Sequence, residues 1–128
     1  MSMPQAATPA APAAGGSSTH SVLMEDIGSL VNNENFTDAW ERYRRGEQNV
    51  FSRRLYTIQG QEVFEEIRRR YRSETSFRDS TDRYLQQFEE LIGELDRGDR
   101  TGVTAKSILL SNRGKVYTIL AHAMGRLG

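Results

Sequence analysis

Cysteine is absent from the 128 residues of this chain. A disulfide framework, a metal site built from thiolates and a cysteine nucleophile are therefore excluded, and the fold must be held by packing. Proline occurs only at Pro4, Pro9 and Pro12, and none interrupts residues 20–128. The most common helix breaker is thus missing from the whole region that we expect to fold.

Long apolar runs are absent as well. No run reaches the roughly 18 to 20 residues that span a bilayer, and residues 1–18 lack the basic start and leucine-rich centre of a signal peptide. We expect no direct membrane insertion and a cytoplasmic location. Residues 1–19 are mostly Ala, Pro, Gly, Ser and Thr, which bury too little apolar surface to offset ordering entropy. This predicts a disordered linker over residues 1–19 and one helical domain over residues 20–128.

Apolar residues recur at helical spacing along the rest of the chain. The most regular set predicts a helix from Thr75 or Ser76 to Gly98. Its members are Phe77, Tyr84, Leu85, Phe88, Leu91, Ile92 and Leu95. Later helices are expected from Thr101 or Thr104 to residue 110, and from Ser111 or Asn112 to residue 124.

Four shorter helices are expected before residue 74. The first begins at Ser21 and stops at Asn32-Asn33. The second is capped by Thr37, with Phe36 before the cap, and ends near Gly46. The third covers residues 47–58, with Gly60 as its end or a kink, and the fourth covers residues 63–73, with Glu65–Arg69 and Glu66–Arg70 as i, i+4 pairs.

No segment shows the sustained alternation of a half-buried strand, and residues 116–120 are the only short apolar run that also suits one. The helices are short and keep no common heptad register. The sequence therefore predicts an all-α fold, a compact orthogonal bundle of five to six helices behind a disordered N-terminal leader.

The net charge is zero, but it is built from blocks of alternating sign. Residues 1–39 carry −4, residues 40–73 carry +4, residues 74–96 carry −5 and residues 97–128 carry +5. This alternation favours helices that lie against oppositely charged neighbours, within the chain or between chains, over a single basic face for phosphate.

Residues with catalytic or metal-binding chemistry are few. Of the two histidines, His20 lies at the linker boundary, and His122 has no Asp, Glu or Cys ligand one turn away, which predicts a half-buried packing residue near a helix end. The pair Gly114-Lys115 lacks the spacing of a phosphate-binding loop. We therefore expect no catalytic residue, no cofactor, no metal site and no enzymatic activity.

Charged residues supply the candidate interaction surface. Glu89, Glu90 and Glu94 are expected on the wet face of their helix, opposite the apolar stripe. The arginines of this surface are Arg44, Arg45, Arg53, Arg54, Arg68, Arg69 and Arg72. A protein partner or a second copy of the chain is the expected ligand. Nucleic acid is the alternative, because residues 42–72 mix arginines with Tyr43, Tyr56 and Tyr71.

Much of residues 36–91 and 114–127 resembles one family. The residues that carry the resemblance are Arg53-Arg54-Leu55-Tyr56, Gly60-Gln61, Phe64, Ile67, Arg70-Tyr71, Phe77-Arg78, Tyr84, Phe88-Glu89, Gly114-Lys115-Val116-Tyr117 and Leu120-Ala121-His122-Ala123. They are similar to the C-terminal helical domain of very large alphaproteobacterial coiled-coil scaffold proteins with apolipoprotein-like repeats, of the growth-pole ring protein type. The resemblance implies a bacterial scaffold role at the cell pole or in envelope growth, without the long coiled-coil body and without catalytic or ligand residues.

Overall fold

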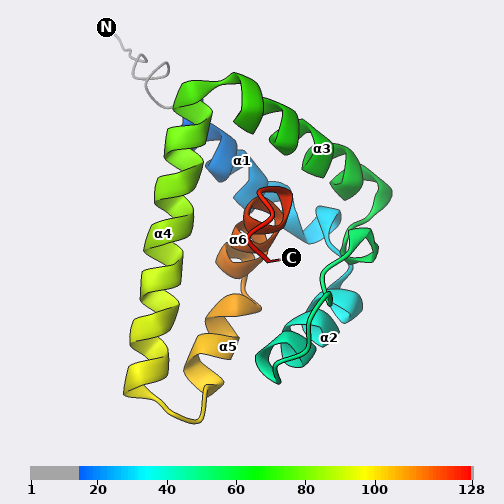
Figure 1. The fold of residues 1–128 in the computed structure, drawn as a ribbon. Helices are drawn as coiled ribbons and strands as arrows, with labels where there is room; N and C mark the ends of the chain where they lie inside the picture. Colours follow the sequence, from blue (N-terminus) through cyan, green and yellow to red (C-terminus); the bar gives the residue numbers. More distant parts are fainter. Residues whose placement is uncertain (1–14, 128) are drawn as a thin grey trace, which may run out of the picture.

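The computed structural model describes the backbone of residues 15–127 and the side chains of residues 23–127 (Figure 1). This part of the chain is all-α, as predicted, and holds no β-strand beyond an isolated bridge between Val31 and Tyr56. Its elements are α1 (Gly15–Leu30), α2 (Asn33–Arg44), the 3-10 helix η2 (Arg53–Leu55), α3 (Ile58–Ser73), α4 (Thr75–Gly98), α5 (Val103–Leu109) and α6 (Asn112–Ala123). None of the helices in residues 15–127 combines the length and the apolar character needed to cross a bilayer.

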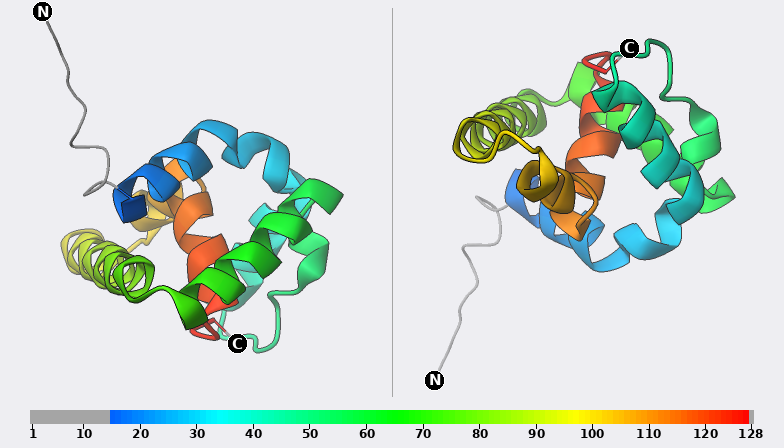
Figure 2. Two further views of the ribbon diagram at one scale, coloured as in Figure 1. Left: turned by 90° about the horizontal axis from the view of Figure 1, so that it is seen from above. Right: turned by 90° about the horizontal axis from the view of Figure 1, so that it is seen from below.

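The last helix, α6, lies at the centre of the molecule. It contacts α1, α3, α4 and α5, and the views from above and below show it running between its neighbours (Figure 2). Residues 116–121 are all buried, on every side of the helix. A helix without a polar face is one that its neighbours enclose. The run that also suited a strand is therefore the core helix.

The first helix begins earlier than the sequence predicted. Residues 15–19, expected as the end of a disordered linker, belong to α1. Once a helix is held by packing, as α1 is through Leu23, Ile27 and Leu30, each added residue gains a hydrogen bond without a new nucleation step. The rest of the predicted linker, residues 1–14, lies outside the described residues.

Asn32 separates α1 from α2. Its backbone is extended, and its side-chain Oδ1 accepts a hydrogen bond from the Asn35 N–H at 3.0 Å. The predicted stop at Asn32-Asn33 is confirmed, but the predicted cap at Thr37 is wrong, because α2 already begins at Asn33. An asparagine satisfies the free N–H groups of a helix start at least as well as a threonine does.

The helix predicted over residues 47–58 does not form. Only η2 turns within it, and Asn49 adopts a positive φ of 58°. The backbone instead pairs with the end of α1. The Asn32 N–H donates to the Leu55 carbonyl at 2.7 Å, and the Thr57 N–H donates to the Leu30 carbonyl at 3.0 Å. Residues 50, 51 and 55 are buried, so the apolar residues reach the core from an irregular segment.

Gly60 lies in the first turn of α3 and does not end or kink the preceding segment. Thr57 caps this helix, since its Oγ1 accepts a hydrogen bond from the Gly60 N–H at 3.1 Å. A Cβ atom at position 60 would stand 2.0 Å from the Leu30 carbonyl oxygen. Glycine is therefore required here for the close approach of α3 to the end of α1.

The predicted helix from Thr75 or Ser76 to Gly98 is confirmed as α4. The predicted end of the preceding helix near Ser73 is confirmed too, but α3 begins at Ile58 and not at residue 63. The predicted i, i+4 pairs on α3 are wrong, because η2 brings an arginine to this helix and other acids lie closer. The ion pairs formed are Arg53–Glu65, Glu66–Arg69 and Arg70–Glu74. Exposed charges can form ion pairs with several neighbours at nearly equal energy, so the sequence does not show which pairs form.

The last two helices begin within one or two residues of their predicted starts. Gly102 caps α5 with a φ of 79°, between the two predicted candidates Thr101 and Thr104. Ser111, one of the two predicted candidates, caps α6. Gly114 lies in the first turn of α6, where a Cβ atom would stand 2.0 Å from the Leu109 carbonyl oxygen.

Candidate functional site

Most of the predicted arginine surface is already paired with carboxylates of the domain itself. The pairs are Arg44–Asp96, Arg45–Glu47, Arg53–Glu65 and Arg69–Glu66. Arg54, Arg68 and Arg72 form no ion pair with a carboxylate of the described residues. The predicted arginines therefore do not form one free basic face. They are spread over α2, η2 and α3.

The predicted acidic face is confirmed for two of its three members. Glu90 and Glu94 are exposed. Glu89 is half-buried, and its carboxylate accepts hydrogen bonds from Tyr117 Oη at 2.8 Å and from Arg126 Nε at 3.0 Å. Burial acts to raise the pKa of Glu89, but the hydrogen bonds from Arg126 and Tyr117 outweigh it and lower this pKa. Placing Glu89 on the wet face was therefore wrong.

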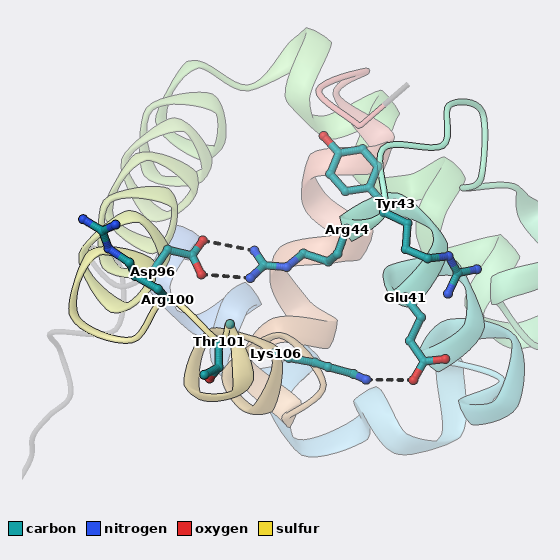
Figure 3. A pocket seen from close by; sticks show the side chains of 9 residues that line it. Glu41, Tyr43, Arg44, Asp96, Arg100, Thr101 and Lys106 are labelled. Atoms are coloured by element: carbon teal, nitrogen blue, oxygen red, sulfur yellow. Dashed lines mark hydrogen bonds and ion pairs between the residues drawn. The ribbon is translucent and has the colours of Figure 1, made fainter.

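An open pocket of about 810 Å³ lies where α2, the end of α4 and α5 meet (Figure 3). We call it the polar pocket. Its lining residues are Glu41, Tyr43, Arg44, Arg45, Asp96, Arg100, Thr101, Gly102 and Lys106. Four of these side chains are cationic and two are carboxylates, so the lining carries an excess of positive charge.

Two ion pairs join the walls of the polar pocket. The Arg44 guanidinium of α2 reaches Asp96 of α4 through two hydrogen bonds, Nη2 to Oδ1 at 2.8 Å and Nη1 to Oδ2 at 3.2 Å. Lys106 Nζ of α5 donates to Glu41 Oε2 of α2 at 2.7 Å. Figure 3 shows both pairs linking facing elements. Together the two pairs connect α2 to both α4 and α5, so the three walls of the polar pocket are joined by contacts within the domain.

These contacts also fix the charges of the two carboxylates. The hydrogen bond from Arg44 lowers the pKa of Asp96, and the hydrogen bond from Lys106 lowers the pKa of Glu41. Both groups are therefore anionic at neutral pH and neutralise one cation each. What they add is geometry more than stability, because exposed ion pairs contribute only about 0 to 1 kcal/mol.

The turn between α4 and α5 is shaped by Asp99. Its carboxylate accepts hydrogen bonds from the backbone and hydroxyl groups of Thr101, at 3.1 and 2.6 Å, and of Thr104, at 3.3 and 2.9 Å. These bonds, the Thr101 hydroxyl first, lower the pKa of Asp99 to about 2. The same turn holds Gly102 beside Arg44, where a Cβ atom would stand 3.2 Å from Nη2.

Two cations of the polar pocket remain for a ligand. Arg100 forms no ion pair with a carboxylate in the described part of the chain. Arg45 has only a 3.3 Å contact with Glu47, and this carboxylate also accepts a hydrogen bond from Arg42 at 2.8 Å. Arg45 belongs to the end of α2 and Arg100 to the turn after α4. Arg100 on one side of the pocket is thus without a carboxylate partner among the described residues, and Arg45 on the other side shares its partner Glu47 with Arg42.

A small apolar cavity of about 160 Å³ adjoins the polar pocket. The two share Tyr43 and Arg44 in their linings. The other residues that line this apolar cavity are Trp40, Phe88, Glu89, Ile92, Leu109, Tyr117 and Leu127. Tyr43 is 39% exposed although it packs against Trp40 and Phe51, at ring-centroid distances of 5.4 and 5.2 Å.

The one histidine with a described side chain lies elsewhere. His122 is half-buried near the end of α6, as predicted, among the rings of Phe51, Tyr56 and Phe64. Its Nδ1 lies 2.7 Å from the Tyr56 hydroxyl. Burial first, and then the positive charge of Arg53, lower the pKa of His122. No group of three or more His, Asp or Glu side chains suited to a metal ion occurs among the described residues.

The sequence identified only part of the polar pocket. Arg44 and Arg45 were among the predicted interaction residues, whereas Arg100 and Lys106 were not. The alternating charge blocks were the usable signal, because they predicted contacts between oppositely charged helices. Arg44–Asp96 joins the second block to the third, and Arg126–Glu89 joins the fourth to the third.

Comparison of the chain with protein-family models, curated proteins and solved structures finds no significant match. The function of the domain is therefore inferred from the side chains of the polar pocket and the apolar cavity.

Proposed function

We propose that this domain is a non-enzymatic protein–protein interaction module whose partner docks at the polar pocket. The observation that carries the proposal is the convergence of three helices on an open pocket whose walls are joined by Arg44–Asp96 and Lys106–Glu41. Preorganised walls reduce the ordering that binding requires. The partially exposed Tyr43 adds a side chain type that is common at protein interfaces.

The partner is another protein or a second copy of this chain. A self-assembling module suits the scaffold role that the resemblance in residues 36–91 and 114–127 implies, at the cell pole or in envelope growth and in the cytoplasm. In that role the helices pack as an orthogonal bundle that presents the polar pocket on one side. The support for this part of the proposal is the residue pattern alone.

Nucleic-acid binding through residues 42–72 has weaker support. Tyr56, and Trp40 just before this range, are 4% and 3% exposed, so neither ring is available for stacking on a base, whereas Tyr43 is 39% exposed. Six of the nine arginines in this range pair with a carboxylate. Titration with duplex and single-stranded DNA at two salt concentrations tests this alternative, and salt-dependent binding at micromolar protein would favour it.

Site-specific photocrosslinking tests the docking proposal. Tyr43→p-azidophenylalanine in the full chain keeps an aromatic ring at the pocket, and the cells that naturally make the protein supply the partner. Asp79 is the control position, exposed on α4 and 17 residues before Asp96, or roughly 25 Å along the helix.

We expect a discrete adduct from position 43 and none from position 79. An adduct of twice the chain mass identifies self-assembly, and any other protein adduct identifies a separate partner. Equal labelling from both positions, or none from position 43, would overturn the proposal.

A further inference from the structure

The polar pocket and the apolar cavity form one composite surface. They lie on either side of Tyr43 and Arg44, which line both. One side offers cationic groups, and the other offers rings and aliphatic side chains such as Phe88 and Ile92. A ligand that spans the two must therefore carry an anionic group and an apolar group at neighbouring positions.

The charge of the polar pocket selects the sign of the ligand. Glu41 and Asp96 are engaged by Lys106 and Arg44, and Glu47 is shared between Arg45 and Arg42, so the described carboxylates around the pocket leave Arg100 unpaired and Arg45 only partly neutralised. In Figure 3 Arg100 lies beyond Asp96, at the outer edge of the pocket, with its guanidinium directed away from Tyr43, and Arg45, the C-cap residue of α2, comes from the other side. Guanidinium groups bind carboxylates through paired, directional hydrogen bonds. Two such groups on opposite sides of a pocket fit a segment with two separated carboxylates better than one compact anion.

The apolar cavity sets the second requirement. Its volume of about 160 Å³ is close to that of one large side chain and far below that of a folded element. Leu109 and Phe88, two of its lining residues, are 2% and 3% exposed. An apolar side chain placed there is removed from water on most of its surface, which is the arrangement of an interface anchor.

We propose that this composite surface binds a short acidic segment of a partner protein, with carboxylates at Arg45 and Arg100 and a large apolar side chain between them in the apolar cavity. The inference rests on the proposed function and deepens it by naming the chemistry of the partner. The domain then distinguishes partners by pattern as well as by charge, because a purely acidic segment leaves the cavity empty.

Selection from a library of random 12-residue peptides, with the full chain as bait, tests the inference. The selected peptides are expected to hold Asp or Glu on both sides of a Leu, Ile, Met, Phe or Trp residue. The double substitution R45E/R100E should weaken their binding at least about tenfold, and added salt should weaken it further. Ile92→Phe, whose larger side chain fills part of the apolar cavity, should weaken the binding of the same peptides.

The matched control is R54E/R72E. It makes the same change of net charge at two exposed arginines outside both linings, and it should leave peptide binding unchanged. Circular dichroism of each variant shows whether the fold persists.

The outcomes separate this inference from the proposed function. If the selected peptides lack acidic residues but R45E/R100E or Ile92→Phe still weakens their binding, the inference is overturned and the pocket remains a docking site. Selection of no peptide, or of peptides that no pocket substitution affects, would overturn the inference too. In that case the adduct from position 43 alone decides whether a protein docks at the pocket.

Discussion

The indole Nε1 of Trp40 donates a hydrogen bond to the hydroxyl of Thr118 at 3.0 Å, and both side chains are buried. This bond ties α2, which carries one wall of the polar pocket, to the central helix α6. Thr118→Val keeps the shape of the side chain but removes this acceptor, leaving the Trp40 N–H buried without a partner, and it also removes the hydrogen bond that the hydroxyl donates to the Gly114 carbonyl at 2.7 Å. We expect the free energy of unfolding to fall by about 1 to 3 kcal/mol, measured by urea denaturation.

Thr81 provides the matched control for this substitution. It is also fully buried, but its hydroxyl has no hydrogen-bond partner among the described residues. Thr81→Val therefore removes an unsatisfied polar group, and we expect stability to stay unchanged or to rise by up to about 1 to 3 kcal/mol. Equal losses in the two variants would contradict the role assigned to the Trp40–Thr118 bond.

Glycine positions separate close helix contacts from open helix surface. Gly60→Ala places a Cβ atom against the Leu30 carbonyl and should destabilise the domain by about 1 to 3 kcal/mol or more. Gly28→Ala, at a helical site with nothing within 4 Å, should instead stabilise it by about 0.5 to 1 kcal/mol. Thermal melting of both variants measures the difference. A loss of stability in Gly28→Ala would mean that the face of α1 around Gly28 packs against other residues.

The apolar stripe of α4 divides into a core side and an edge. Phe88 is 3% exposed and stacks on Tyr117 at a centroid distance of 4.6 Å, whereas Leu91 is only half-buried. Phe88→Ala should cost about 3 to 5 kcal/mol of stability. Leu91→Ala should cost clearly less, and a reversed order in chemical denaturation would mean that α4 is rotated about its axis.

Acid should destabilise the domain through His122. Because burial and nearby arginines lower its pKa in the folded state, the unfolded chain binds more protons at pH values below the ordinary histidine pKa of about 6.5. The free energy of unfolding should therefore fall as the pH decreases from about 6.5 toward the lowered pKa. His122→Gln should flatten this dependence between pH 7 and 5.5. An unchanged slope would assign the acid sensitivity to other groups.

The sequence predicted the fold where local pattern and tertiary packing agree. The stripe from Phe77 to Leu95 fits a single helix, and α4 follows it. Residues 47–58 also fit a helix by spacing, yet the backbone bonds to Leu30 and Asn32 require an extended path there. Ile58, an apolar member of that predicted stripe, is 81% exposed. Long-range pairing of this kind is invisible in a local window.

The candidate site was less predictable for a related reason. Arg44 and Arg100 are 56 positions apart, and only the path of α4 and the turn after it brings them to the same pocket. Charge blocks indicated that such contacts exist, but they did not indicate which arginines remain unpaired. The difference between Arg44, held by Asp96, and Arg100 depends on side-chain geometry that no composition measure contains.

The central claim is that Arg45 and Arg100 of the polar pocket bind a protein partner. The most direct test is the yield of the position-43 adduct in cells that make the R45E/R100E variant, compared with R54E/R72E at equal expression. We predict that the adduct falls at least about tenfold in R45E/R100E and persists in R54E/R72E. An undiminished adduct in R45E/R100E would contradict the claim.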